Sequence, residues 1–224
     1  MNIFANQNCL FIAPHTDDVE LGSGATLARC VDECERVDVV VFSTAIESLP
    51  TGSSVDRLKY EFYSSMEKYG IPIENLHVLN FPVRRLNYFR QDILDELIIL
   101  KNKFSPTIVF TPAMGDVHQD HECVTYETIR AFKSQTIFGY ELPWNHFQFQ
   151  SRVYFEITEK HLDTKIEALR SYESQVEKKR PYFDPAFTLG QARMHGVKSG
   201  YGLAEAFDLI TLKIPGHKNL ESAS

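Results

Sequence analysis

Two short polar segments of the chain concentrate the side chains that bind metal ions in hydrolytic enzymes. Residues 14–20 read P-H-T-D-D-V-E and residues 115–121 read G-D-V-H-Q-D-H, so together they hold three of the eight histidines and several aspartates. Hydrolytic zinc sites typically use three His or carboxylate ligands and leave the fourth position to water. The two segments therefore predict a hydrolytic metal site, provided that the fold brings them together.

The spacing within each segment suits a shared ion. His15 and Asp18 are three residues apart, as are His118 and His121, and side chains at this spacing face the same side of a helical turn. A bound Zn²⁺ polarises an amide carbonyl and lowers the pKa of water to about 7, and a neighbouring carboxylate can accept the proton of that water. The departing amine needs a proton, which histidine can supply near neutral pH. We therefore expect one histidine to remain free of the metal.

Strand-like and helix-like patterns alternate along the chain. Short apolar or β-branched runs predict strands at residues 9–13, 36–42, 76–79, 107–111, 136–140 and 153–157, and amphipathic spacing predicts helices at residues 25–31, 55–69, 91–104, 121–132 and 159–171. Such alternation implies parallel pairing with helices on both faces. The prediction is one α/β domain over residues 1–224, with a Rossmann-like, mostly parallel sheet.

This architecture gives the two polar segments a shared location. They follow the first and fourth predicted strands, and an open parallel sheet binds its ligands outside the carboxyl ends of its strands. Beyond Pro143 the pattern becomes irregular and rich in proline and aromatic residues. We expect that part of the chain to form walls or a lid around the cleft.

With these motifs in this order, the sequence resembles the LmbE-like or PIG-L-type N-acetylglucosaminyl deacetylases. The hallmark of that family approximates A-H-P-D-D-E followed by glycines and a helix, and then a later H-x-D-H. Here residues 13–24 read A-P-H-T-D-D-V-E-L-G-S-G and residues 118–121 read H-Q-D-H, with Thr16 in place of the usual proline and Glu20 displaced by one position. Further similarity lies at Arg57 and Glu61, at residues 165–175 and at residues 204–207.

The resemblance implies a role for each residue of the two motifs. The implied zinc ligands are His15, Asp18 and His121. Asp17 is implied to be the general base, and His118 is implied to stabilise the oxyanion or to protonate the amine, with Asp120 as its orienting partner. The implied activity is zinc-dependent removal of an N-acyl group, in this family acetyl, from an amino-sugar-type small molecule such as a glycoside or sugar nucleotide. Symmetric homo-oligomers, which family members often form, are a further expectation.

Two other functions stay open at this point. One is a zinc-independent nucleotide- or sugar-nucleotide-binding enzyme that transfers a group, and the other is a non-catalytic metal-binding scaffold. Asp17 and Asp18 taken alone could simply cap the following helix, because Asp is a favoured N-cap residue. Residues 22–24, G-S-G, could bind a phosphate at a helix N-terminus. Close packing of the helix on the sheet is the interpretation we favour for these glycines.

Three side chains are candidates for contact with the substrate. Arg57 could bind a hydroxyl or phosphate, although with Glu61 at i, i+4 it also fits a surface ion pair. Arg84 follows the third predicted strand and could meet a pyrophosphate, while a solvated loop is the alternative. Trp144 could stack on a sugar ring or base, although aromatic clusters more often belong to a core.

Composition excludes some classes of partner. The formal charge of −7 offers no basic surface for nucleic acid, and no apolar run approaches the ~20 residues that span a bilayer. The start of the chain lacks the pattern of a signal peptide, so a cytoplasmic location is expected. The four cysteines fit reduced thiols. Cys30 and Cys34 could begin a second metal site, but the sequence shows no partner near them.

Overall fold

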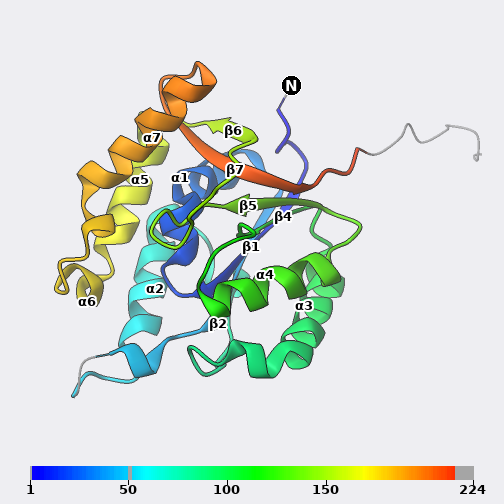
Figure 1. The fold of residues 1–224 in the computed structure, drawn as a ribbon, viewed down its shortest axis with the longest axis vertical. Helices are drawn as coiled ribbons and strands as arrows, with labels where there is room; N and C mark the ends of the chain where they lie inside the picture. The colour runs from blue at the N-terminus through cyan, green and yellow to red at the C-terminus, as the bar shows by residue number, and fades with distance from the viewer. Residues whose placement is uncertain (1, 50–51, 215–224) are drawn as a thin grey trace, which may run out of the picture.

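A seven-stranded mixed sheet forms the centre of the computed structural model, which describes residues 2–49 and 52–214 (Figure 1). The strands are β1 (Asn8–His15), β2 (Arg36–Ser43), β3 (Leu76–Val78), β4 (Ile108–Pro112), β5 (Thr136–Tyr140), β6 (Val153–Glu156) and β7 (Ala204–Thr211). Their order across the sheet is β3-β2-β1-β4-β5-β7-β6. The first five strands in this order pair in parallel with one another, whereas β7 is antiparallel to both β5 and β6. The predicted α/β class with a mostly parallel sheet is confirmed.

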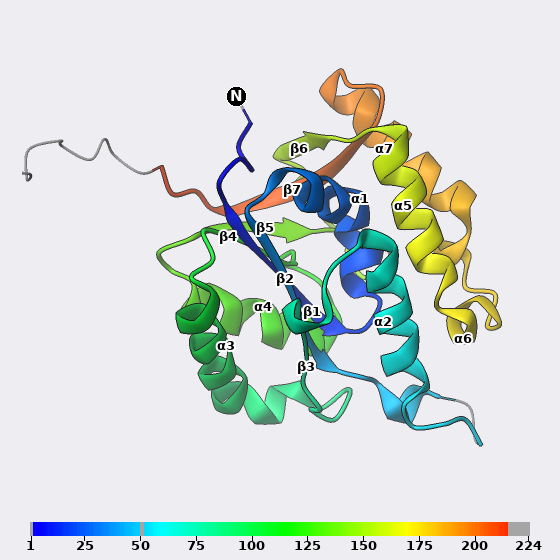
Figure 2. The ribbon, with the colours of Figure 1, turned by 180° about the vertical axis from the view of Figure 1, so that it is seen from behind.

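Helices cover both faces of this sheet, as Figures 1 and 2 show from opposite sides. They are α1 (Asp18–Glu33), α2 (Arg57–Tyr69), α3 (Arg90–Phe104), α4 (Gln119–Ala131), α5 (Glu159–Arg170), α6 (Glu173–Val176) and α7 (Pro185–Ser199). Helices α3 and α4 lie on one face, and α1, α2, α5 and α7 lie on the other. Within the described ranges, no helix combines the length and the apolar character needed to cross a lipid bilayer.

Strand β1 divides the core into two layers because successive side chains of a strand point to opposite faces. Leu10 and Ile12 pack in the layer beneath α3 and α4, whereas Phe11 and Ala13 pack in the layer beneath α1, α2 and α5. All four side chains are fully buried. A strand buried on both faces reads as a continuous apolar run, which is why this element was predictable from its sequence.

The C-terminal part of the chain is more regular than predicted. Residues 185–199, expected to lie in an irregular wall, form α7, and β7 inserts between β5 and β6 as an antiparallel strand. Strand β7 has no simple apolar pattern because it reads A-E-A-F-D-L-I-T, with two carboxylates inside it. One of them, Glu205, is nevertheless buried, which a residue-by-residue pattern does not predict.

Helix α1 starts before its predicted first residue and is broken at Ser23, whose φ of −145° is not helical. After the break, the N–H groups of Ala25 and Thr26 donate to the Glu205 carboxylate at 3.2 and 2.7 Å. Lys165 Nζ donates to Glu205 at 2.7 Å and to a backbone carbonyl of the first half of α1 at 2.9 Å. A buried ion pair therefore replaces the hydrogen bonds that the break removes.

The glycines beside the break allow α1 to approach the sheet and α2. A Cβ atom on Gly22 would lie 2.2 Å from a ring carbon of Tyr140, and one on Gly24 would lie 2.7 Å from Tyr69 Oη. No side chain fits in that space. The prediction that these glycines serve close packing is confirmed, and the helix they lie in already begins at Asp18.

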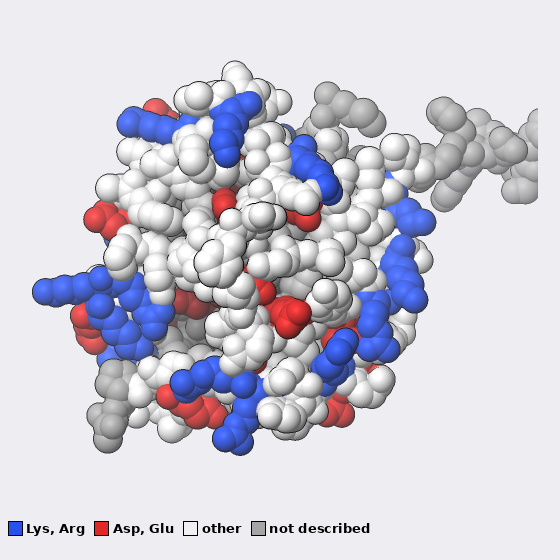
Figure 3. Space-filling view, in the orientation of Figure 1, with Lys and Arg blue, Asp and Glu red and all other residues white. Residues whose placement is uncertain are grey.

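Charged side chains are scattered rather than gathered on the face drawn in Figure 3. Lysines and arginines lie around its rim with aspartates and glutamates among them.

Candidate metal centre and substrate pocket

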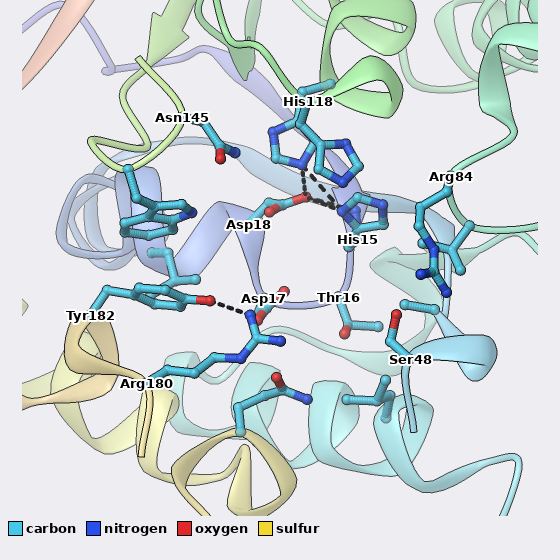
Figure 4. Close-up of a pocket in the computed structure, with 17 residues that line it drawn as sticks. His15, Thr16, Asp17, Asp18, Ser48, Arg84, His118, Asn145, Arg180 and Tyr182 are labelled. Carbon is cyan, nitrogen blue, oxygen red and sulfur yellow. Dashed lines mark hydrogen bonds and ion pairs between the residues drawn. The ribbon is translucent and has the colours of Figure 1, made fainter. Parts of the chain in front are cut away.

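The two polar segments meet where β1 and β4 lie side by side. These neighbours pair in parallel, with Cys9 opposite Ile108 and Phe11 opposite Phe110. The chain leaves β1 toward β2 on one side and β4 toward β5 on the other, so their carboxyl ends flank the position where the strand order reverses. Ligand sites in open α/β sheets form at this position. A cavity of about 270 Å³ opens there (Figure 4).

Three ligand atoms converge at the bottom of this pocket. His15 Nδ1 lies 3.2 Å from His121 Nε2, and each of these nitrogens lies 3.3 Å from Asp18 Oδ2. Atoms about 2.0–2.1 Å from one tetrahedral ion would be separated by roughly 3.3–3.4 Å. The donor set and its spacing therefore fit a zinc ion, and these are the three residues that the family resemblance implies as ligands.

Each imidazole is fixed by a carboxylate on its other nitrogen. His15 Nε2 lies 3.0 Å from Asp120 Oδ2, and His121 Nδ1 lies 2.7 Å from Asp116 Oδ2. Such carboxylate partners fix the tautomer and orientation of metal-binding histidines. The Asp120 carboxylate also accepts hydrogen bonds from the backbone N–H groups of Arg84 and Leu86 at 2.5 and 3.1 Å.

The expected pairing of Asp120 with His118 is wrong as far as the carboxylate is concerned. Its oxygens are turned toward His15, and only the backbone N–H of Asp120 contacts the other histidine, donating to His118 Nδ1 at 3.2 Å. The reason is local: His118 is the N-cap of α4, and its ring accepts from the first turn of that helix. Burial, followed by the nearby His121 and His15, lowers the pKa of His118 to about 4.

His118 nevertheless belongs to the same centre. Its ring stacks on His121 with 4.5 Å between centroids, and the ligand atoms of all three histidines lie within 4.8 Å of one another. It is only half-buried and lines the pocket. Because Nδ1 accepts a hydrogen bond, the neutral ring carries its proton on Nε2 and can donate it to a ligand.

Asp17 lies on the pocket wall next to the candidate ligand Asp18 (Figure 4). It occupies the N-cap position of α1 but makes no capping hydrogen bond through its side chain, so the capping interpretation is wrong for this residue. Desolvation, and then the charge of Asp18, raises the pKa of Asp17 to about 6. The carboxylate can therefore exchange a proton near neutral pH.

The three predicted substrate contacts separate into two groups. Arg84 and Trp144 line the pocket, and Trp144 stacks on Tyr182 with ring centroids 3.9 Å apart. Arg57 does not line it: its guanidinium binds Glu61 at 3.1 Å and Glu177 at 3.0 Å. These two carboxylates hold Arg57 against α6, so the structure does not support its predicted role.

Several residues of the site were not predicted from the sequence: one of them orients His121, and the others line the pocket. Asp116 lies in the same loop as His118 and could have been proposed as a second carboxylate for a second imidazole. The polar and aromatic pocket residues among them are Ser48, Asn145, Gln175, Arg180 and Tyr182. Ser48, Gln175 and Tyr182 lie in helical turns of three or four residues, and the other two lie in connecting segments. Four of these five follow Pro143, which confirms the prediction that the C-terminal part supplies walls of the cleft. Their individual positions depend on short turns and connecting segments whose conformation cannot be predicted from the sequence pattern.

Comparison with known proteins adds a family and a fold. The family model described as PIG-L, GlcNAc-PI de-N-acetylase, matches residues 10–132. A relative from Escherichia coli (strain K12), described as the uncharacterized deacetylase YaiS, is 30% identical over 171 residues, which cover 74% of this chain and 90% of the relative.

Solved structures share the architecture at lower identity. N,N'-diacetylchitobiose deacetylase from Pyrococcus horikoshii superposes with a TM-score of 0.73 at 21% identity, covering 91% of this chain and 84% of that one. The 4-carboxy-2-hydroxymuconate hydratase GalB from Pseudomonas putida KT2440 gives a TM-score of 0.73 at 15% identity, covering 95% and 100%. Since the two differ in activity, likeness at this level shows the fold alone.

Proposed function

The chain belongs to the PIG-L family of de-N-acetylases, and from this premise we propose that it is a zinc-dependent hydrolase that removes an acetyl group from the nitrogen of an amino-sugar-type substrate. His15, Asp18 and His121 would hold the ion. When bound, Zn²⁺ would polarise the amide carbonyl and make a water molecule more acidic. The observation that carries the proposal is the 3.2–3.3 Å separation of the three ligand atoms.

Asp17 is the proposed general base. Its pKa of about 6 leaves it mostly ionised at neutral pH, so it can accept a proton from the attacking water. The same carboxyl group can then hold that proton and deliver it to the departing amine, because its pKa lies close enough to neutrality for both transfers. One residue thus serves as base and then as acid.

His118 is proposed to stabilise charge rather than to move a proton. Its lowered pKa of about 4 keeps the ring neutral at neutral pH, and the hydrogen bond that Nδ1 accepts from Asp120 leaves Nε2–H as the donor. An N–H aimed at the carbonyl oxygen stabilises the negative charge that develops there. Of the two roles implied for this histidine by the sequence, the geometry supports the oxyanion role.

The pocket wall supports a small sugar as the substrate. A volume of about 270 Å³ lies just below the ~300–1,000 Å³ range of ligand pockets, which suits one ring. Trp144 and Tyr182 form an aromatic wall, while Arg84 and Arg180 approach from different sides (Figure 4). Aromatic faces pack on the apolar side of a ring, and guanidinium groups bind hydroxyl or phosphate oxygens.

The test is acetate release by the zinc-loaded chain from a panel of N-acetylated glycosides and sugar nucleotides. We expect acetate and free amine in equal amounts, loss of activity on chelation, and recovery when zinc is added back. Asp17→Asn should lower kcat by about 10²–10⁴-fold while stoichiometric zinc is retained. Asp163→Asn, a change at an exposed residue of α5, is the matched control and should leave kcat unchanged.

Three outcomes would contradict the proposal. Activity that survives chelation would favour the zinc-independent transferase. Full biological function of the Asp17→Asn variant would favour the scaffold. Absence of acetate release from every member of the panel, with zinc bound, would show that a shared fold has been mistaken for a shared reaction.

A further inference from the structure

A second cluster of metal-binding side chains lies outside the pocket and consists of Cys9, Cys30 and Cys34. The three sulfur atoms lie within 4.8 Å of one another, and Cys9 Sγ is 3.2 Å from Cys34 Sγ. The expectation that Cys30 and Cys34 have no partner is wrong, because β1 supplies the third thiol. Cys30 and Cys34 are neighbours through helical i, i+4 spacing at the end of α1, whereas Cys9 reaches them only through the packing of α1 on the sheet.

This thiol cluster is separate from the zinc centre. Cys9 lies near the start of β1 and His15 at its end, and six residues of extended strand span about 20 Å. The same separation applies to α1, which carries Asp18 at its first residue and Cys30 in its last turns. The two clusters therefore lie at opposite ends of the central strand β1.

The donor set of the thiol cluster is sulfur only. Among the described residues that could ligate a metal, no histidine or carboxylate joins these three. An ion about 2.3 Å from each of three sulfurs needs S···S separations of roughly 3.8–4.0 Å. The Cys9–Cys34 separation is 3.2 Å, and all three sulfurs lie within 4.8 Å of one another. Small side-chain rotations would bring the thiols to that spacing.

The surroundings favour a soft ion of low coordination number. Cys9 and Cys30 are almost completely buried and belong to the apolar core, so two of the three sulfur atoms are shielded from water. Thiolate ligands select soft ions such as Cu(I). Zn²⁺ prefers a fourth ligand in tetrahedral geometry, which no described side chain at this cluster offers.

An entry path exists at the third cysteine. Cys34 is only partly buried and lines an open surface cavity together with Arg36, Gly70, Pro72 and Asn75. An ion can therefore reach Cys34 from solvent and then engage the two buried thiols. All three cysteines are free rather than joined in a disulfide, so each can lose its proton to a metal.

We propose that Cys9, Cys30 and Cys34 form a three-thiolate site for one soft, thiophilic metal ion, for which Cu(I) is the probe. Binding exchanges thiol protons for metal–sulfur bonds and involves no change in oxidation state. The bound ion would join the end of α1 to the start of β1. Because the folded chain holds the three thiols close together, it should bind the metal more tightly than the unfolded chain does, and the metal should raise the melting temperature.

The test is an anaerobic titration of the reduced 224-residue chain with Cu(I) in competition with a chromophoric Cu(I) chelator. We expect one equivalent of tightly bound Cu(I), thiolate-to-metal charge-transfer absorption in the ultraviolet, and an X-ray absorption spectrum with three sulfur neighbours. Cys34→Ser should weaken binding by on the order of 100-fold or more, since each ligand of such a site carries a large share of the binding free energy. Cys123→Ser changes the fourth cysteine, which lies on α4, and should bind as the unmodified chain does.

Folding is controlled for separately. Cys34 is the least buried of the three, so Cys34→Ser should keep the native circular dichroism spectrum, and the rise in melting temperature on adding Cu(I) should disappear in this variant alone. Equal Cu(I) affinity of the Cys34→Ser variant and the unmodified chain would overturn the proposal, because the ion would then sit at the histidine cluster. So would the absence of tight binding together with formation of a Cys9–Cys34 disulfide by hydrogen peroxide, which would identify a redox pair.

Discussion

Glu205→Gln tests whether the buried ion pair supports the break in α1. The carboxylate accepts from two backbone N–H groups of α1 and from Lys165 Nζ, and the two side chains are 7% and 4% exposed. A glutamine keeps the size but loses the charge, and its side-chain NH₂ group would face the N–H groups that now donate to the carboxylate. Lys165 would then be a buried cation without a counter-charge, which costs about 3–5 kcal/mol.

Denaturation in urea measures this loss as a change in the free energy of unfolding. For a chain of this length it corresponds to a fall of about 6–20 °C in melting temperature. The double variant Glu205→Gln/Lys165→Met should be more stable than the sum of the single changes predicts, because no unpaired charge remains. The control is Glu167→Gln, which removes one partner of an exposed pair with Arg170 and should cost no more than about 1 kcal/mol.

A loss below about 1 kcal/mol for Glu205→Gln would refute this reasoning. It would mean that water enters the break, or that the backbone of α1 relaxes to satisfy its own donors. The reasoning would also be refuted if the double variant lost as much free energy of unfolding as the two single variants lose together. The two groups would then act independently, and the interaction between them could not explain the conformation of the helix.

Three further predictions concern the metal centre, acid stability and packing. Asp116→Asn should weaken zinc binding by about 10–100-fold, because it removes the carboxylate that orients His121; isothermal titration with zinc measures this. Asp38 is buried, and although burial raises its pKa, hydrogen bonds from Arg36 and His77 outweigh that and lower the pKa below 3.8. The unfolded chain therefore binds more protons below about pH 4, so stability is lost as pH falls through that range, and Asp38→Asn should reduce this loss in acid titrations followed by circular dichroism. Gly22→Ala places a Cβ atom 2.2 Å from Tyr140 and should cost at least about 1–3 kcal/mol of unfolding free energy.

Each of these has an outcome that would count against it. Unchanged zinc affinity in Asp116→Asn would show that packing alone orients the imidazole. An acid transition of Asp38→Asn identical to that of the unmodified chain would show that other carboxylates dominate. For Gly22→Ala the control is Gly190→Ala on α7, where a Cβ meets no atom within 4 Å; equal stability of the two variants would contradict the close approach of α1 to Tyr140.

The parts of the fold that were predictable are those in which local pattern and burial agree. Strands β1, β2 and β4 are buried on both faces, so a run of apolar residues suffices to identify them. The location of the metal centre followed from topology, because polar segments after parallel strands must share one edge of the sheet. His15 and His121 could therefore be placed together from the sequence although they are far apart along the chain.

The parts that were not predictable depend on pairs formed through space. Strand β7 could not be recognised from its pattern because it contains the charged Glu205. The burial of Glu205 depends on Lys165, which lies on α5. The Asp120 carboxylate points to His15 instead of His118, which is nearer in the sequence, because α4 fixes the direction of the Asp120 side chain. Cys9 joins Cys34 only through the packing of α1 on β1, and a spacing rule within one helix cannot include it.

The hydrogen bonds of Asp120 join two properties of the centre that would otherwise be independent. One oxygen contacts His15 and the backbone N–H of Arg84, and the other accepts from Leu86. A ligand that fixes Arg84 in the pocket also fixes the carboxylate that orients the imidazole. If binding in the pocket and metal binding are coupled through this carboxylate, thermodynamic reciprocity requires that each change the affinity for the other by the same factor. Affinity for the cofactor should accordingly be measured with and without an occupant of the pocket, since the two titrations describe one coupled equilibrium.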